Sequence, residues 1–177
     1  MKRHLLLLTI GFLFARPAPA QMVSSGHSTI TTEVFAGGSY FRAGFSPGTN
    51  LAGWQTDIDY NLAKHVGIVL DFGGQYKSVE GATLGLYEYM AGPRFMYRRG
   101  RSTAFVHGLL GGDVTHVPGS TIGAFAAGVG GGLDVKVGKF VSIRIIQVDW
   151  IDDHTREVWR QNLRGAVGVV FKLPHMY

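Results

Sequence analysis

Strict alternation between apolar and polar or very small side chains is the feature that most limits how this chain can fold. It recurs in four long segments, at residues 53–62, 66–76, 125–137 and 163–173. In the first segment one face carries Trp54, Thr56, Ile58, Tyr60 and Leu62, and the other carries Gln55, Asp57, Asp59 and Asn61. A period of two over such lengths predicts β-strands with one apolar face and one polar or tiny face.

Four weaker segments, 31–41, 84–97, 103–113 and 141–150, complete the expected set of strands. The last two have a mixed phase, which is compatible with a β-bulge in either of them. Eight strands of roughly 10–14 residues are longer than the ~5–6 residues usual in soluble sheets. They match the ~9–11 tilted residues that cross a bilayer.

The expected connections alternate in length along the chain. Three are tight turns, at 63–65, 98–102 and 138–140. Four are longer loops, at 42–52, 77–83, 115–123 and 151–161. This alternation predicts an all-β fold, an eight-stranded antiparallel up-and-down β-barrel over residues 31–173.

The positions of the glycines indicate which strand face points into the barrel. The polar face carries Gly67, Gly73, Gly128, Gly130, Gly132 and Gly168. A solvent-exposed strand face favours Thr, Lys and Glu, whereas the interior of a narrow barrel needs small residues beside a few charges. The polar face is therefore expected inside the barrel and the apolar face outside.

Aromatic side chains form two groups along the apolar face. Trp54, Tyr76, Tyr87 and Trp150 are expected near the loop end, and Tyr60, Tyr97, Phe140 and Phe171 near the turn end. Two aromatic girdles around an apolar band are typical of a transmembrane β-barrel. The alternative is a secreted, lipocalin-like binding barrel with the aromatic side chains in its core.

The N-terminus has the pattern of an export signal. Residues 1–20 combine a basic start, an apolar run at 5–15 and the small-x-small sequence Ala18-Pro19-Ala20, which predicts a signal peptide cleaved after Ala20. The apolar run is too short for the ~20 residues of a membrane-spanning helix. Residues 21–30 are then a short N-terminal segment and residues 174–177 a C-terminal tail.

Charge and cysteine content exclude several classes of function. The 17 Lys and Arg against 12 Asp and Glu give +5. Lys2, Arg3 and Arg16 all lie in the signal peptide, so 14 basic groups (17 − 3) and 12 acidic groups remain, a difference of +2. This balance predicts no nucleic-acid partner. The absence of cysteine excludes disulfides, thiolate catalysis, Cys-ligated metals and a lipoprotein anchor.

Several segments also carry a family resemblance. They are GSYFR (38–42), AGPRFMYRRGR (91–101), FVHGLLGG (105–112), GGGLDVKV (130–137), IRIIQVDW (143–150) and NLRGAVGVVFKL (162–173). The chain resembles the small outer-membrane β-barrel proteins, the OmpA/OmpX-like barrel family of Gram-negative-type bacteria.

The resemblance implies a location in the cell outer membrane, as a monomer among outer-membrane lipids and lipopolysaccharide. It also implies that the barrel assembly machinery recognises the C-terminal strand. Gly168, Phe171 and Leu173 resemble that assembly signal, although Leu173 stands where an aromatic residue is usual. We expect no peptidoglycan-binding domain of the kind that follows the barrel in full-length OmpA-type proteins.

Charged residues on the inner face are candidates for function. The acids are Glu33, Asp57, Asp59, Asp71, Glu88 and Asp134, and the bases are Arg94, Lys136, Arg164 and Lys172. One interpretation is an ion pathway, which would make the protein a small pore. The favoured interpretation is a network of ion pairs that fills the lumen, because an eight-stranded barrel is just wide enough for side chains.

An outer-membrane enzyme that modifies lipid A is the other alternative. By resemblance to known deacylases of this kind, such an enzyme would carry a His-x-Ser pair that faces lipid. None of the seven histidines has Ser two residues later. His107 is expected to be a packed lumen residue. We therefore predict no catalytic residue, no cofactor and a structural or surface-interaction role through the four longer loops.

Three further motifs carry no predicted site. Asp152, Asp153, His154 and Glu157 are expected to be solvated rather than bound to a metal ion. The Gly-rich stretch 128–132 lacks the following helix that a phosphate-binding loop needs. The basic turn 98–101 is expected to be solvated.

Overall fold

The protein is a closed antiparallel β-barrel of eight strands in chain order. The computed structural model describes residues 31–44, 48–79, 82–155 and 158–173. The strands are β1 (Thr31–Ala43), β2 (Thr49–Asn61), β3 (Val66–Val79), β4 (Ala82–Arg99), β5 (Ser102–Val117), β6 (Ser120–Lys136), β7 (Val141–Thr155) and β8 (Val158–Leu173). The expected signal peptide, the segment 21–30 and the tail 174–177 lie outside the described residues.

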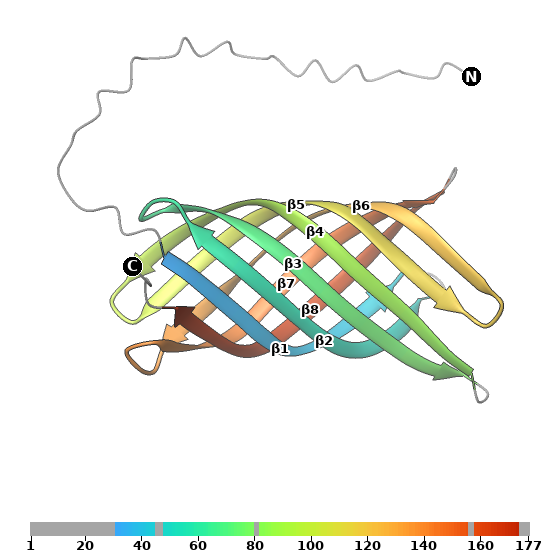
Figure 1. Cartoon of the computed structure of the whole chain (residues 1–177), viewed down its shortest axis with the longest axis horizontal. Helices are drawn as coiled ribbons and strands as arrows, with labels where there is room; N and C mark the ends of the chain where they lie inside the picture. Colours follow the sequence, from blue (N-terminus) through green and yellow to red (C-terminus); the bar gives the residue numbers. More distant parts are fainter. Residues whose placement is uncertain (1–30, 45–47, 80–81, 156–157, 174–177) are drawn as a thin grey trace, which may run out of the picture.

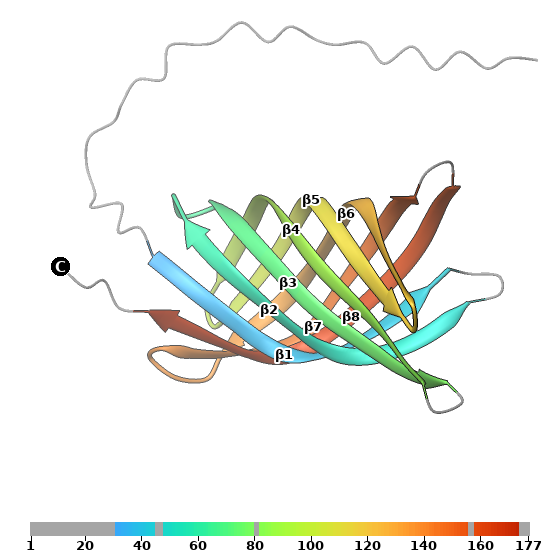
Figure 2. The ribbon, with the colours of Figure 1, turned by 45° about the vertical axis from the view of Figure 1, so that its right-hand side comes forward.

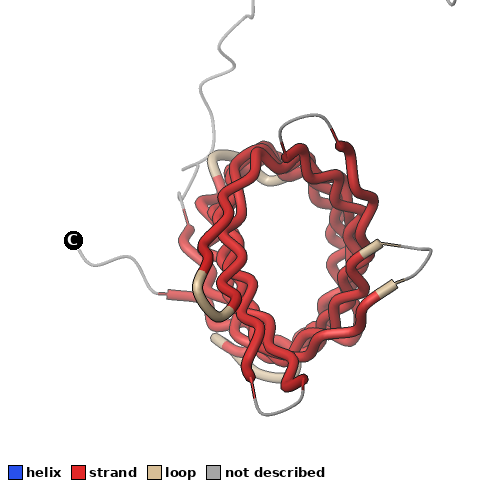
Figure 3. Tube along the Cα trace, turned by 90° about the vertical axis from the view of Figure 1, so that its right-hand side faces the viewer, coloured by secondary structure: helices blue, strands red, loops and turns tan. Residues whose placement is uncertain are grey.

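Closure comes from β1, which pairs with β2 on one side and with β8 on the other. All strands cross the barrel at a tilt (Figures 1 and 2), and the end view is a ring of strands (Figure 3). No helix in the described part of the chain is long and apolar enough to cross a membrane. The all-β, up-and-down topology predicted from the sequence is confirmed.

The orientation of the two strand faces is inverted relative to a soluble barrel. In β2 the outward side chains Trp54 and Tyr60 are 43% and 45% exposed, whereas the inward Asp57 and Asp59 are 0% and 2% exposed. The same pattern continues around the barrel, where the outer face is apolar and the inner face holds most of the buried charges. An apolar exterior around a polar interior is the arrangement of a transmembrane barrel.

The aromatic side chains form belts on this outer face. Trp54, Tyr76 and Tyr87 lie side by side at the end where β3 passes to β4. The Trp54 Nε1 group donates to the Tyr76 hydroxyl at 3.4 Å, and the Tyr76 and Tyr87 rings are 5.8 Å apart, edge to face. At the opposite end Tyr97 and Phe171 are exposed. Aromatic rings at the two levels suit the two interfaces of a bilayer.

The prediction of four long loops is wrong. The strands have 13–18 residues and extend into the expected loops, so that β5 ends at Val117 and β6 begins at Ser120. Gly119 takes a φ of 79° in this short connection, a conformation that glycine tolerates best. The extra strand length could not be predicted from side chains, because backbone hydrogen bonds between strands continue where the side chains no longer alternate.

The bulge considered for residues 141–150 is present. The register of β7 against β8 shifts between Arg144 and Gln147, and Ile145 and Ile146 are both exposed. Residues three apart on a regular strand face opposite sides, but the bulge turns Arg144 and Gln147 both inward. In contrast, β5 keeps one register with β6 from Ser102 to Val117.

Heat-modifiable migration tests the fold directly. We expect unboiled protein in a detergent gel to migrate differently from boiled protein, because a closed barrel keeps its ladder until heated. Comparing the two samples, together with the membrane and soluble fractions of cells, is the measurement. Identical migration combined with a soluble protein would contradict the transmembrane barrel.

Candidate functional site: the charged lumen and its periplasmic mouth

Arg144 is the centre of the first of two ion-pair clusters in the lumen. Its guanidinium contacts Asp57 across the barrel and donates to the two carboxylate oxygens of Asp134 at 2.8 and 3.2 Å. It also donates to the side-chain oxygen of Gln147 at 2.6 Å. Arg94 donates to Asp57 at 3.0 Å and contacts Asp59. Two arginines from different strands therefore share one aspartate.

Arg164 is the centre of the second cluster. It holds Asp71 with two parallel hydrogen bonds of 2.8 Å each, the bidentate geometry that suits a guanidinium and a carboxylate. It also donates to Asp149 at 2.8 Å and lies 3.5 Å from Glu88. Asp149 is in contact with His107 Nε2 at 2.8 Å. Four strands besides β8 contribute partners to this cluster.

These charges are almost completely removed from solvent. Arg144, Arg164, Asp57, Asp71 and Asp149 are all 0% exposed. Buried charges of this kind persist only when they are paired and hydrogen-bonded. The prediction that an ion-pair network fills the lumen is therefore confirmed in its main part.

Two phenylalanines complete the packing around the arginines. The guanidinium carbons of Arg94 and Arg144 lie 4.2 and 4.4 Å from the centre of the Phe105 ring, and Arg144 also lies 4.2 Å from the centre of the Phe35 ring. Stacking of this kind stabilises a desolvated guanidinium. Both rings occupy inner-face positions that the sequence analysis left unassigned.

Glycines on β6 make room for these large side chains. A Cβ at Gly130 would overlap the carboxylate of Asp149, and a Cβ at Gly132 would lie 2.7 Å from the Phe105 ring. The glycine-rich inner face predicted from the sequence thus has a direct cause. The small residues on one strand leave the volume that ion pairs and rings from other strands occupy.

An apolar layer lies inside the barrel beside the ion pairs and extends toward the outer end, where Phe41, Leu51 and Leu86 line a cavity of about 220 Å³ together with polar residues. It consists of the buried side chains Phe41, Leu51, Val69, Leu86, Met90, Leu109, Ala126 and Ile151. This layer was not predicted, because the inner face was expected to be polar or small throughout. The same alternation that marks an inner face does not specify whether its members are charged or apolar.

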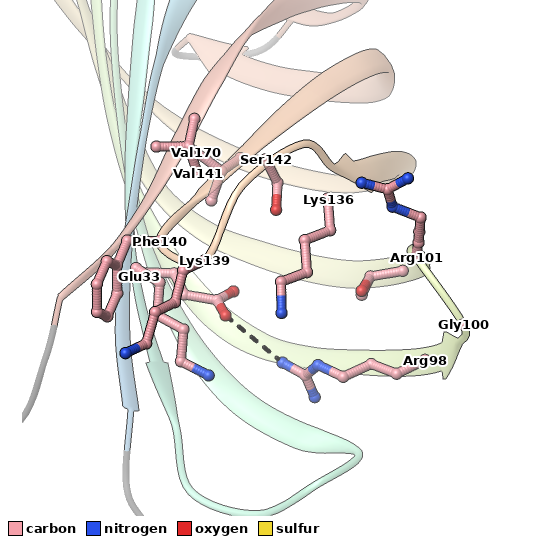
Figure 4. A pocket seen from close by; sticks show the side chains of 12 residues that line it. Glu33, Arg98, Gly100, Arg101, Lys136, Lys139, Phe140, Val141, Ser142 and Val170 are labelled. Carbon is pink, nitrogen blue, oxygen red and sulfur yellow. Dashed lines mark ion pairs between the residues drawn. The ribbon is translucent and has the colours of Figure 1, made fainter.

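The periplasmic mouth is the opposite opening, where β1 begins and β8 ends. It holds a cavity of about 190 Å³ (Figure 4). Charged residues around it are Glu33, Arg98, Arg101, Lys136, Lys139 and Lys172. An even number of strands places both chain ends at this end of the barrel, and we expect it to be the periplasmic end, where outer-membrane barrels carry their short turns.

Three predicted lumen residues lie at this mouth instead of in the central network. Lys136 and Lys172 are exposed, and the side chain of Glu33 is 20% exposed. They face inward, as predicted, but they are placed at the ends of their strands, beyond the paired acids. The predictions for Asp57, Asp59, Asp71, Glu88, Asp134, Arg94 and Arg164 are confirmed, since all are buried in the lumen.

Arg144 and Asp149 belong to the network but were not predicted from the sequence. Both lie in the segment 141–150, where the bulge breaks the alternation that would have marked them as inward. A charged residue within an otherwise apolar strand is the signal that could have found them, because a membrane-facing charge is costly. His107 is packed in the lumen, as predicted.

The acidic group near the outer end is engaged with neighbouring side chains. Asp152 accepts from Trp150 at 3.0 Å, and Asp153 lies 3.4 Å from Arg160. The His154 and Trp159 rings are 4.5 Å apart. Glu157 lies outside the described residues. Within the described ranges no group of three or more His, Asp or Glu is arranged to hold a metal ion.

The basic turn 98–101 is only partly solvated, in contrast to the prediction. Arg98 donates to the backbone carbonyl of Lys64, lies 3.1 Å from the Met96 sulfur and 4.0 Å from Glu33. Arg99 and Arg101 are exposed. Arg98 therefore joins the β2–β3 turn to the mouth of the barrel.

No family model and no curated protein matches the sequence. Solved structures do match its fold. Neisserial surface protein A is 14% identical with a TM-score of 0.69, over 80% of this chain and 97% of that one. The attachment invasion locus protein Ail of Yersinia pestis is 14% identical with a TM-score of 0.59, over 81% and 99%. The outer-membrane protein OprG of Pseudomonas aeruginosa is 9% identical with a TM-score of 0.55, over 85% and 99%.

These likenesses concern the fold, and they agree with the inverted faces and the aromatic belts. A closed ring of tilted strands, an apolar exterior and a charged interior occur together in the described residues. The chain has the fold of the small eight-stranded outer-membrane β-barrels that its sequence resembles.

Proposed function

We propose that the protein is a structural, non-catalytic and non-conducting barrel of the outer membrane. The observation that carries the proposal is the filled lumen. Ion pairs occupy its centre, and buried apolar side chains pack beside them toward the outer end. An ion crossing the barrel would have to displace paired, desolvated charges, and that displacement is costly.

The position of His107 argues against lipid-A chemistry. Its Nε2 atom faces Asp149 at 2.8 Å, and its Nδ1 atom lies 3.3 Å from Arg94. Both nitrogens are thus engaged inside the barrel, so this imidazole is not available to a lipid at the outer face. A general base must reach the proton that it removes, and this one does not.

Surface contact is the second part of the proposal. Because the connections between the strands are short, contact with a surface partner would be made by the outer ends of the strands. Trp159, which is 60% exposed and packed against His154, and the exposed Ile122 are the side chains best placed for it. The name of the similar Yersinia pestis protein, attachment invasion locus protein, lends support to such a role here.

The remaining partners follow from the barrel's surface. The apolar belt is expected to contact outer-membrane lipids, with lipopolysaccharide in the outer leaflet. The C-terminal strand β8 would be recognised by the assembly machinery. Because the barrel is closed and leaves no strand edge to pair with a second copy, we propose a monomer.

Planar-bilayer recordings test the closed lumen. We expect the purified, folded protein to produce no stable channel steps in salt solution, because the buried ion pairs leave no continuous aqueous path. A folded, non-conducting eight-stranded barrel and a bilayer without protein are the reference recordings. Reproducible steps that disappear when the protein is boiled would favour the small pore over the structural role.

A separate comparison tests the enzyme alternative. Mass spectra of lipid A from cells with and without the protein are expected to be identical. A shift corresponding to a lost or added acyl chain would show that the protein modifies lipid A.

A further inference from the structure

The periplasmic mouth concentrates positive charge around an open cavity. Its lining includes five cationic side chains, from Arg98, Arg101, Lys136, Lys139 and Lys172, against the single acid Glu33. Figure 4 shows Lys136 and Arg98 pointing into the same space, on the side that faces Glu33. The central network differs, because there each arginine is matched by acids.

The cations of the mouth are largely unneutralised. Glu33 pairs with Arg98, at 4.0 Å. For Arg101, Lys136, Lys139 and Lys172, no carboxylate among the described residues lies within ion-pair distance. Lys139 has only the Phe140 ring, 5.1 Å from its Nζ atom. Four like charges around one cavity repel each other, so an anion bound among them would relieve that repulsion.

The cavity has room and polar groups for such an anion. Its volume of about 190 Å³ greatly exceeds the ~10–15 Å³ that one water molecule needs. Thr103 and Ser142 add hydroxyl donors to the lining. A phosphoryl group carries up to two charges and three acceptor oxygens, so it can engage several cations at once, whereas a carboxylate has one charge and two oxygens.

We propose that the periplasmic mouth binds a phosphate-bearing ligand, held by Lys136 and Lys172 together with Arg101 and Lys139. The site is separate from the central ion-pair network and from the structural role proposed above. The phosphate group has two available sources at this end of the barrel. It is either the headgroup of an anionic phospholipid in the inner leaflet or a soluble phosphate compound in the periplasm.

Isothermal titration with inorganic pyrophosphate tests the site. The protein is placed in phosphatidylcholine nanodiscs, which carry no net lipid charge. We expect saturable binding that weakens as salt is raised, and about tenfold or more weaker binding by the double variant Lys136→Gln/Lys172→Gln. The single variant Lys136→Gln gives a second measurement if the double variant fails to show heat-modifiable migration.

A matched control removes the same charge from the same end of the barrel. Lys64→Gln/Arg99→Gln neutralises two exposed cations outside the cavity lining and is expected to change the affinity less than about twofold. Equal losses in both double variants would mean a diffuse surface potential and would overturn the site. Absence of binding by the wild type, or equal binding of citrate, would overturn it as well.

Native mass spectrometry distinguishes the two sources. Protein released from nanodiscs that contain phosphatidylglycerol and phosphatidylcholine is examined for retained lipid. Phosphatidylglycerol retained by the wild type and lost from Lys136→Gln/Lys172→Gln supports the site with a lipid headgroup in it. Pyrophosphate binding without retained phosphatidylglycerol supports the site with a soluble phosphate compound.

Discussion

Replacing Arg164 with alanine is expected to lower the free energy of unfolding in detergent by about 3–5 kcal/mol, the cost of breaking a buried ion pair. Arg164 is fully buried and holds Asp71 with two hydrogen bonds and Asp149 with a further one. Glu88 also depends on it, at 3.5 Å. The substitution would leave three buried acids close together without their shared cation.

Urea unfolding of the folded barrel, followed by tryptophan fluorescence, measures this change. Arg42→Ala is the matched control, because Arg42 lies near the outer end of β1 and, among the described residues, makes one exposed side-chain hydrogen bond, of 3.3 Å to Asn50. We expect the control to cost at most about 1 kcal/mol. Small and equal effects of the two substitutions would mean that Arg164 is solvated, and the inward phase of β8 would be wrong.

Replacing Val167 with arginine is expected to destabilise the barrel in a lipid bilayer by about 2–4 kcal/mol, the cost of a lipid-facing arginine near the midplane. Val167 is 56% exposed on the outer face. It lies midway along β8 between the outward Leu163 and Phe171, and hence far from both interfaces. The charged group would therefore be held in hydrocarbon or would distort the bilayer.

Folding into lipid vesicles, measured by the heat-modifiable shift over a range of urea, is the assay for this substitution. Ile122→Arg is its control, since Ile122 is also outward and exposed but lies next to the β5–β6 connection, beyond the apolar belt. We expect a cost of about 0–1 kcal/mol there, as at an interface. If Val167→Arg were as mild as the control, the outer face of β8 would contact water.

Much of the barrel's architecture could be predicted because it is encoded locally. The outward Tyr60 and the inward Asp59 are neighbours in β2, and a period of two is enough to separate their faces. The glycines of β6 then indicate which face is inside. Strand ends were less predictable. The strand β5 continues to Val117 and β6 already begins at Ser120, because their backbones pair there without a clear side-chain alternation.

The candidate sites show the same division. Lys136 and Lys172 were correctly predicted to lie on the inner face. Their position at the mouth, beyond the paired acids, depends on where their strands end relative to β1. Arg144 escaped prediction because its inward direction depends on a bulge, which is a property of the pairing of β7 with its neighbours. Alternation within one strand does not reveal a register shift against another.

By itself, then, the sequence determined the all-β class, the number and order of the strands, and the inverted faces, since each is a matter of residues within one strand or turn. The tertiary structure alone decided which charges pair. Arg164 and Asp71 are 93 residues apart, on strands that are not neighbours in the barrel. Ion pairing across a lumen depends on the register and tilt of every strand between the two partners. The pattern of residues within one strand contains no information about this combined geometry.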